Sequence, residues 1–169
     1  MKTLEDLRGV VADSILVRAV DTSARLTDLG VPHMLIGGVA VGLHGYPRAT
    51  KDVDFLVGPE AFKPSPILVY RDDVVEIARV GFTDLNPPGK YPLLDQELRV
   101  GHLAVVSLNG LLLMKLDAWR PQDQRDVIML LGVQPEALDD ALVYLQEAVP
   151  ERAQRSILRN RLLEVAQPT

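Results

Sequence analysis

Apolar residues repeat along the first thirty positions at the spacing of a helix. Four of them are three, four and four residues apart and share one helical face: Leu4, Leu7, Val11 and Ile15. The pattern ends at Gly30, and glycine commonly follows the last turn of a helix. We therefore expect a helical start to the chain.

Short apolar runs separated by turn residues come next, and they predict strands. The runs cover 33–36, 52–57, 74–80 and 102–106, and a short helix is expected over 39–45. Gly-Gly, Gly-Pro and Pro-Pro-Gly sequences interrupt the runs. This part of the chain is predicted to form a small sheet.

From Ser107, an expected N-cap, the pattern is helical to the end. Helices are predicted over 111–119 and 122–131, and Pro135 and Pro150 are expected to be the first residues of two more. Strands followed by helices indicate an α+β fold with a helical C-terminal layer. We divide it into 1–106 and 107–169, which can also form one continuous domain.

Composition narrows the class of protein. The 169 residues include 18 Lys and Arg against 23 Asp and Glu, a net charge of −5, with 47% hydrophobic residues and no cysteine. These values exclude disulfides, thiolate zinc sites, a disordered chain and broad charge-driven coating of nucleic acid. The charged N-terminus is unlike a signal peptide, and the most apolar stretch, 103–116, is too short to span a bilayer. We expect a cytoplasmic protein without membrane contact.

The acids of one short segment carry the candidate chemistry. Gly37-Gly38 ends one predicted strand, and Asp52 and Asp54 follow after thirteen residues in the next. Residues two apart in a strand share a face, so the two carboxylates repel each other unless a cation or a hydrogen-bond network offsets the repulsion. Mg²⁺ prefers such oxygen ligands, and a glycine turn at the start of a helix favours phosphate binding. An Asp-x-Asp or a Gly-Gly alone is more often a plain turn.

The segment Ile36–Asp54 resembles the signature of the nucleotidyltransferase superfamily related to DNA polymerase β, in particular its small bacterial subgroup that includes abortive-infection toxins. Ser107–Lys115 and Asp123–Asp126 are similar to that subgroup's lysine-bearing helix and its following helix with paired acids. The resemblance implies a minimal mixed sheet flanked by helices. It also implies an NTP substrate and two Mg²⁺ ions.

By this resemblance, Gly37 and Gly38 hold the nucleotide phosphates while Asp52 and Asp54 ligate the metal. Glu76 is our candidate for the third carboxylate and catalytic residue, with Asp84 second, although Glu76 also suits a solvated strand position. Two cations are assigned to phosphate: Arg48 and Lys115. Arg48 can equally be an ordinary loop residue and Lys115 a lysine at the edge of a core helix, and Asp126 either joins the site or pairs with an arginine.

The function implied is Mg²⁺-dependent transfer of an NMP from an NTP to an acceptor hydroxyl on RNA (a tRNA end, for example), a protein or a small molecule. The subgroup adds a toxin-like role with an antitoxin or operon partner. Only twenty-one residues separate Phe55 from Ile77, where relatives commonly place a helix that walls the substrate cleft. The alternative is therefore a catalytically inactive module of the same fold that binds a nucleotide or a partner protein.

Overall fold

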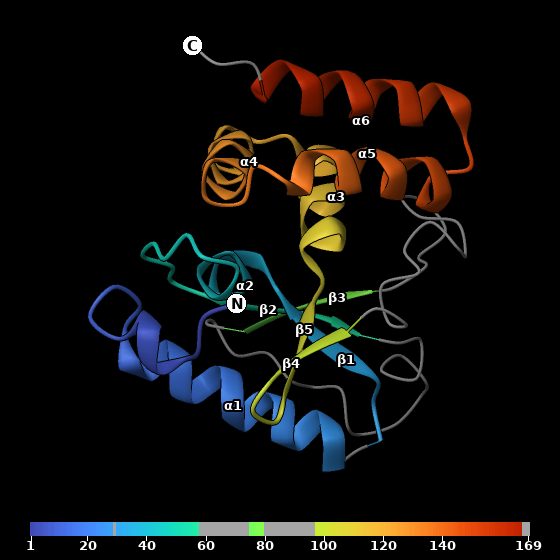
Figure 1. The fold of residues 1–169 in the computed structure, drawn as a ribbon. Helices are drawn as coiled ribbons and strands as arrows, with labels where there is room; N and C mark the ends of the chain where they lie inside the picture. Colours follow the sequence, from blue (N-terminus) through green and yellow to red (C-terminus); the bar gives the residue numbers. More distant parts are fainter. Residues whose placement is uncertain (29, 58–74, 80–96, 167–169) are drawn as a thin grey trace. The chain divides into compact units, whose positions relative to one another are not determined.

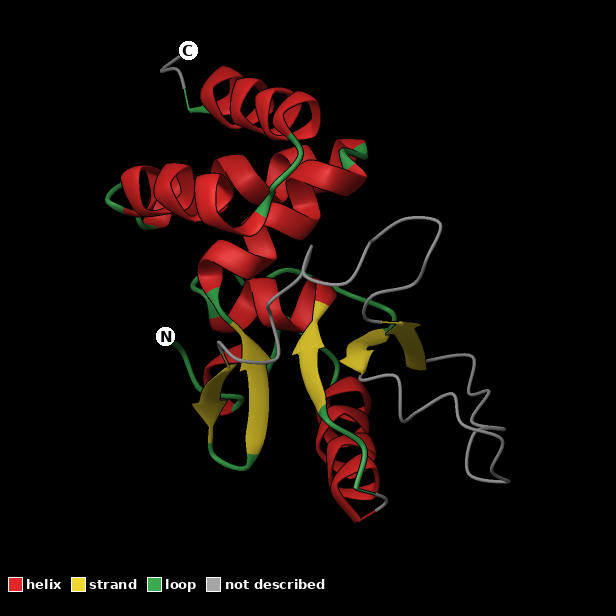
Figure 2. Cartoon of the chain, turned by 90° about the vertical axis from the view of Figure 1, so that its right-hand side faces the viewer, coloured by secondary structure: helices red, strands yellow, loops and turns green. Residues whose placement is uncertain are grey.

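The computed structural model describes residues 1–28, 30–57, 75–79 and 97–166. The fold is α+β, as expected, and the chain divides into two compact units, Met1–Ser107 and Leu108–Thr169. The first unit holds the sheet, and the second is built from helices (Figures 1 and 2). No helix among the described residues combines the length and apolar character that crossing a membrane requires.

The first unit is a five-stranded mixed sheet in the order β3-β2-β1-β5-β4. The strands are β1 (His33–Ile36), β2 (Val53–Val57), β3 (Val75–Arg79), β4 (Glu97–Val100) and β5 (Leu103–Val106). β1 runs antiparallel to β2 and parallel to β5, while β2 and β3 are parallel and β4 and β5 antiparallel. The adjacent β1 residues Met34 and Leu35 are both fully buried, so this central strand is covered on both faces.

Two helices of the first unit pack on the sheet. α1 (Asp13–Asp28) contacts β1, β2 and β5, and α2 (Gly37–Leu43) contacts β1 and β2 (Figure 1). α1 buries one stripe of its surface, which includes Ile15, Ala19 and Leu26. Its end before Gly30 agrees with the predicted stop, because Gly30 has a φ of 65°.

The predicted continuous helical stripe at the N-terminus is wrong in one respect. The chain forms a short 3-10 helix, η1 (Glu5–Leu7), and turns before α1 begins. Gly9, with a φ of 83°, makes the turn. Leu7 and Val11 are nevertheless buried, at 0% and 2% exposed. The apolar spacing thus identified core residues correctly but not a single helix.

The second unit contains α3 (Leu108–Ala118), α4 (Pro121–Val133), α5 (Ala137–Ala148) and α6 (Arg152–Val165). α3 packs against each of the other three helices, and its buried residues are Gly110, Leu111, Leu112, Leu113, Lys115 and Leu116. Figure 2 shows these helices packed together, and the described residues of this unit include no strand.

The expected helix starts at Pro135 and Pro150 lie two residues too early. α5 begins at Ala137 and α6 at Arg152. The amides of Ala137 and Leu138 donate to the carbonyls of Gln134 and Pro135, which closes a separate turn before α5. Proline is compatible with such a turn because its φ already has the required value.

Candidate functional site

The turn between β1 and α2 lies against Asp54, the acid of β2. β1 pairs with β2 in a register that places Ile36 opposite Asp54, so the next residue, Gly37, lies beside the Asp54 side chain. Gly37 has a φ of 66°. A Cβ added there would overlap the Asp54 carboxylate and come within 2.6 Å of its Cγ. Only glycine fits a backbone position that is both left-handed and this close to another side chain.

Gly38 makes a second close approach, to the loop that precedes β2. A Cβ at Gly38 would lie 2.6 Å from Thr50 Oγ1 and 3.4 Å from a guanidinium nitrogen of Arg48. That guanidinium donates to the Ala49 carbonyl at 3.2 Å. The two glycines therefore let a carboxylate, a hydroxyl and a guanidinium approach the same stretch of backbone.

Asp52 joins this group through a hydrogen bond. The Thr50 hydroxyl donates to Asp52 Oδ1 at 2.9 Å. Asp52 directly precedes β2 and is exposed, whereas Asp54 lies within the strand and is half-buried. The structure thus brings together Gly37, Gly38, Arg48, Asp52 and Asp54, and it adds Thr50. We call these six residues the glycine–acid cluster.

The backbone of β3 brings Glu76 to the same edge of the sheet. β2 and β3 are parallel, and their register pairs Asp54 with Glu76. The Glu76 side chain and all of Asp84 lie outside what the structure describes. Among the described side chains, which do not include that of Glu76, no three His, Cys, Asp or Glu residues gather as a metal site would require. The role of Glu76 as third ligand stays a prediction.

The donor set of the cluster suits a hard cation. Asp52 and Asp54 offer carboxylate oxygens and Thr50 a hydroxyl oxygen, and oxygen ligands are those that Mg²⁺ takes. The exposed Asp52 and half-buried Asp54 leave at least part of this donor set open to solvent. The residues present therefore fit Mg²⁺ bound together with phosphate oxygens.

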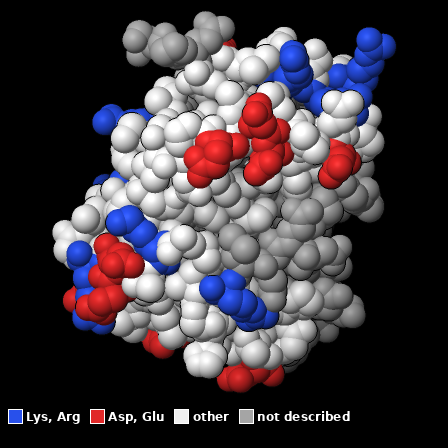
Figure 3. All heavy atoms as spheres, in the orientation of Figure 1, with Lys and Arg blue, Asp and Glu red and all other residues white. Residues whose placement is uncertain are grey.

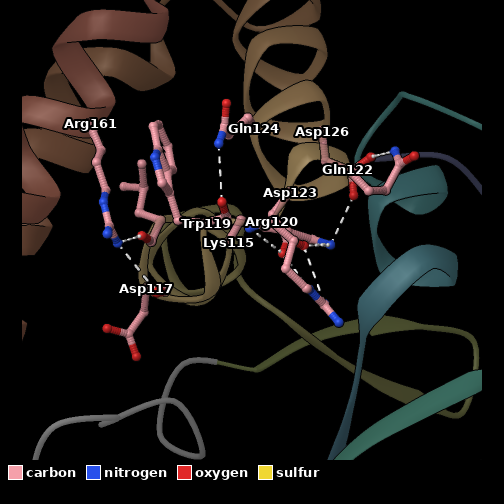
Figure 4. A network of polar contacts seen from close by, with 10 residues as sticks. Lys115, Asp117, Trp119, Arg120, Gln122, Asp123, Gln124, Asp126 and Arg161 are labelled. Atoms are coloured by element: carbon pink, nitrogen blue, oxygen red, sulfur yellow. Dashed lines mark hydrogen bonds and ion pairs between the residues drawn. The ribbon is translucent and has the colours of Figure 1, made fainter.

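Lys115 lies in the helical unit, inside a buried ion cluster (Figure 4). Its Nζ is 2.8 Å from both Asp123 Oδ1 and Asp126 Oδ2, and the three residues are 7%, 1% and 0% exposed. Arg120 Nε adds a 2.7 Å contact to Asp123, and the Gln122 amide donates to Asp126 at 2.8 Å. Contact of Lys115 with a triphosphate stays a prediction, while the described contacts join α3 to α4.

The buried ion cluster around Lys115 keeps Asp123 ionised in spite of its burial. Burial disfavours the charged carboxylate, but hydrogen bonds from Arg120 and Lys115 outweigh it and hold the pKa of Asp123 below its usual value. Sequence reasoning assigned Asp126 either to the active site or to an arginine. The structure adds an ion pair with Lys115, eleven positions earlier, to the hydrogen bond from Gln122.

A second group of polar contacts lies at the C-terminal end of α3, next to this ion cluster. Trp119 follows the last residue of α3 with a φ of 51°, and the Arg161 guanidinium lies 5.1 Å from the centre of its ring. Arg161 also donates to the Leu116 and Asp117 carbonyls at 2.7 and 3.3 Å (Figure 4). This basic residue of α6 thus satisfies carbonyls that a helix end leaves without partners.

His33 and His44 have structural partners. His33 Nδ1 donates to the Val31 carbonyl at 2.8 Å, and its Nε2 lies 2.7 Å from Ser23 Oγ. His44 is buried and donates from Nε2 to the Val106 carbonyl at 2.8 Å, which ties the end of α2 to β5. Burial lowers the pKa of His44 below its ordinary value of 6.5.

Comparison with known proteins assigns the chain to no family. No protein-family model matches the chain, and no curated protein matches it significantly. The functional argument therefore depends on the residues and contacts described above.

Proposed function

We propose that the protein is an Mg²⁺-dependent nucleotidyltransferase. The observation that carries the proposal is the glycine–acid cluster, in which Gly37 lies against the Asp54 carboxylate and Thr50 joins Gly38 to Asp52. A phosphate-binding turn next to paired carboxylates is the arrangement that nucleotidyl transfer requires. The register of Asp54 with Glu76 supports a third carboxylate at the same edge.

The reaction is a substitution at the α-phosphorus of an NTP. An acceptor hydroxyl oxygen forms the new bond to phosphorus, the bond to the β-phosphate oxygen breaks, and pyrophosphate leaves. We assign the hydroxyl proton to the carboxylate of Asp52 or Asp54. Bound Mg²⁺ would be held by Asp52, Asp54 and Glu76, and would neutralise charge on the triphosphate.

The remaining residues of the cluster orient the substrate. Arg48, whose guanidinium lies beside Gly38, is assigned to the phosphates, because a guanidinium can make two parallel hydrogen bonds to phosphate oxygens. The backbone at Gly37 and Gly38 limits how far the triphosphate can move. The Lys115 ammonium contacts Asp123 and Asp126, and its contact with the triphosphate stays a prediction.

The acceptor class follows only from the resemblance of the segment Ile36–Asp54 to small bacterial nucleotidyltransferases. RNA, a protein side chain and a small molecule all present a suitable hydroxyl. The same proposal includes a toxin-like role, an antitoxin or operon partner, and a cytoplasmic location with its supply of NTP and Mg²⁺.

On the face drawn in Figure 3, charges of both signs are interspersed, and neither sign dominates it.

A transfer assay tests the proposal. Wild-type protein is incubated with each α-labelled NTP, Mg²⁺, and total tRNA or cell lysate, and label in macromolecules and small molecules is measured. We expect transfer by the wild type and none by Asp52→Asn/Asp54→Asn. The matched control is Asp21→Asn/Asp28→Asn, which removes two exposed carboxylates from α1 and should retain full activity.

The two alternatives give different results in this assay and in a binding measurement. NTP binding without transfer would favour the catalytically inactive module. Equal transfer by wild type and the Asp52/Asp54 variant would contradict the assignment of the site. Neither transfer nor Mg²⁺-dependent NTP binding would contradict the nucleotidyltransferase proposal as a whole.

A further inference from the structure

Helices α5 and α6 pack side by side, and a groove with a volume of about 390 Å³ lies between them (Figure 1). The two helices give it walls of different chemistry. α5 contributes mainly apolar side chains, and α6 contributes three arginines: Leu142, Val143 and Leu145, and Arg152, Arg155 and Arg159. We call it the α5–α6 groove.

The apolar wall of the groove is partly open to solvent. Val143 is 60% exposed, and Leu142 is half-buried. A single exposed valine is common on protein surfaces, but this one borders a row of arginines in the same groove. A ligand of the groove therefore meets apolar and basic side chains together.

The three arginines of the basic wall lie on one face of α6, because they are three and four residues apart. Arg152 and Arg159 are exposed, and neither side chain makes an ion pair or hydrogen bond with the part of the chain that the structure describes. Arg155 is half-buried and donates to the Val149 and Pro150 carbonyls at 2.8 and 3.5 Å. Two of the three guanidinium groups are thus available to an anion.

No acid among the described lining residues offsets this positive charge. The other two polar residues of the lining, Gln146 and Ser156, are uncharged. Glu147 and Glu151 lie between the two sets of lining residues in the sequence, but they do not line the groove. Like charges three or four residues apart destabilise a helix, so an anionic ligand would relieve repulsion along α6.

We propose that the α5–α6 groove binds an acidic amphipathic helix of a partner protein. The apolar stripe of that helix lies on Leu142 and Val143, and its carboxylates pair with the arginines of α6. Arg152 and Arg159 are seven positions apart, about 10 Å along the helix. Acids at positions i, i+3 or i+4, and i+7 of the bound helix span the same length.

The lining favours a peptide over a nucleic acid. The described lining residues include no aromatic side chain, whereas proteins that hold single strands commonly stack bases on aromatic rings. Phosphates would also leave the apolar wall without a partner. The proposed binding depends on residues of the helical unit alone, so its failure would leave the proposed nucleotidyl transfer untouched.

Fluorescence anisotropy with the full chain and a labelled peptide tests the proposal. The peptide has about twenty residues, long enough to form a helix, and repeats the sequence Glu-Leu-Ala-Glu-Leu-Leu-Glu. Its control has Gln in place of every Glu and keeps the apolar stripe. We expect the acidic peptide to bind at micromolar concentration and about tenfold or more tightly than the control.

Charge reversal in the groove should weaken this binding. Arg152→Glu/Arg159→Glu should weaken it by about tenfold or more, because it places like charges opposite one another. The matched control, Lys2→Glu/Arg125→Glu, changes the net charge by the same amount at exposed positions outside the groove and should keep affinity within about twofold.

A second pair of variants tests the apolar wall. Val143→Glu should weaken binding by about tenfold. Ile157→Glu, at a 52% exposed position of α6 outside the groove, should leave it unchanged.

Three results would overturn the proposal. One is no binding of the acidic peptide at protein concentrations up to about 300 μM, or binding equal to that of the Gln control. Another is equal binding by the wild type and by Arg152→Glu/Arg159→Glu. The third is tighter binding of an oligouridine of similar length that is lost in this double variant, because the groove would then hold nucleic acid.

Discussion

At the residue scale, the proposed site depends on two glycines that allow side chains to approach the backbone. Gly37 makes room for the Asp54 carboxylate, and Gly38 for the Thr50 hydroxyl. The same contact holds Asp52, because Thr50 donates to it. A substitution at either glycine should therefore alter the acids as well as the turn.

Gly37→Ala should abolish NTP binding and destabilise the protein. The added methyl overlaps Asp54, and such overpacking costs about 1–3 kcal/mol beyond the strain of a left-handed alanine. Gly30→Ala is the matched control, since Gly30 has nearly the same φ, 65° against 66°, and open space around it. Urea unfolding and NTP titration of both variants measure the difference, and equal effects would contradict the geometry of the site.

His44 should make stability depend on pH. Its folded pKa is lowered by burial, so its unfolded form binds a proton more readily. Stability is then complete above the unfolded pKa of 6.5 and falls as pH drops below that value towards the folded pKa.

The measurement is the free energy of unfolding at pH 7.5 and 5.5 for wild type and His44→Gln. The glutamine amide can donate to the Val106 carbonyl but does not titrate. The decrease should be smaller in the variant than in the wild type. The same decrease in both proteins would show that other groups cause it.

At the scale of elements, helices and strands bring together charges that are distant in the sequence. Parallel pairing of β2 and β3 aligns Asp54 with Glu76, and packing of α3 on α4 joins Lys115 to Asp123 and Asp126. The first alignment concerns the proposed chemistry. The second concerns the stability of the helical unit.

Glu76→Gln should reduce nucleotidyl transfer by about 100-fold, because it removes a carboxylate from the proposed metal ligands. Glu5→Gln, an exposed position in η1, is the control. Activity of the Glu76 variant equal to that of the control would exclude Glu76 and leave Asp84 as the candidate.

Lys115→Met should destabilise the protein by about 3–5 kcal/mol, because it leaves two buried carboxylates without their shared cation. Arg159→Met, an exposed position on α6, should change stability by less than about 0.5 kcal/mol. Thermal and urea unfolding measure both. A stable Lys115 variant that has lost only NTP binding would favour the phosphate role that the sequence suggests.

At the scale of the whole molecule, the sequence predicted the α+β class and most of the strands. Short apolar runs identified β1, β2, β3 and β5, because strands select for apolar and β-branched residues. β4 was missed because its four residues, Glu97–Val100, alternate charged and apolar side chains in a run too short to stand out.

The candidate site was predictable where it depends on local spacing and not where it depends on packing. The Gly-Gly and Asp-x-Asp spacing indicated these residues, and the structure places Gly37 against Asp54 and links Gly38 to Asp52 through Thr50. The buried contacts of Lys115 with Asp123 and Asp126 depend on how two helices cross, which residue spacing alone does not determine. The same holds for Thr50, whose hydroxyl acts through a hydrogen bond to Asp52.

The central claim is that the glycine–acid cluster binds an NTP through Mg²⁺, and calorimetric titration with a non-hydrolysable NTP tests it without knowledge of the acceptor. The account predicts binding in Mg²⁺ that is lost in EDTA and in Asp52→Asn/Asp54→Asn. Binding should be retained in Asp21→Asn/Asp28→Asn. NTP affinity that is the same with and without Mg²⁺, and the same in the Asp52/Asp54 variant, would contradict it.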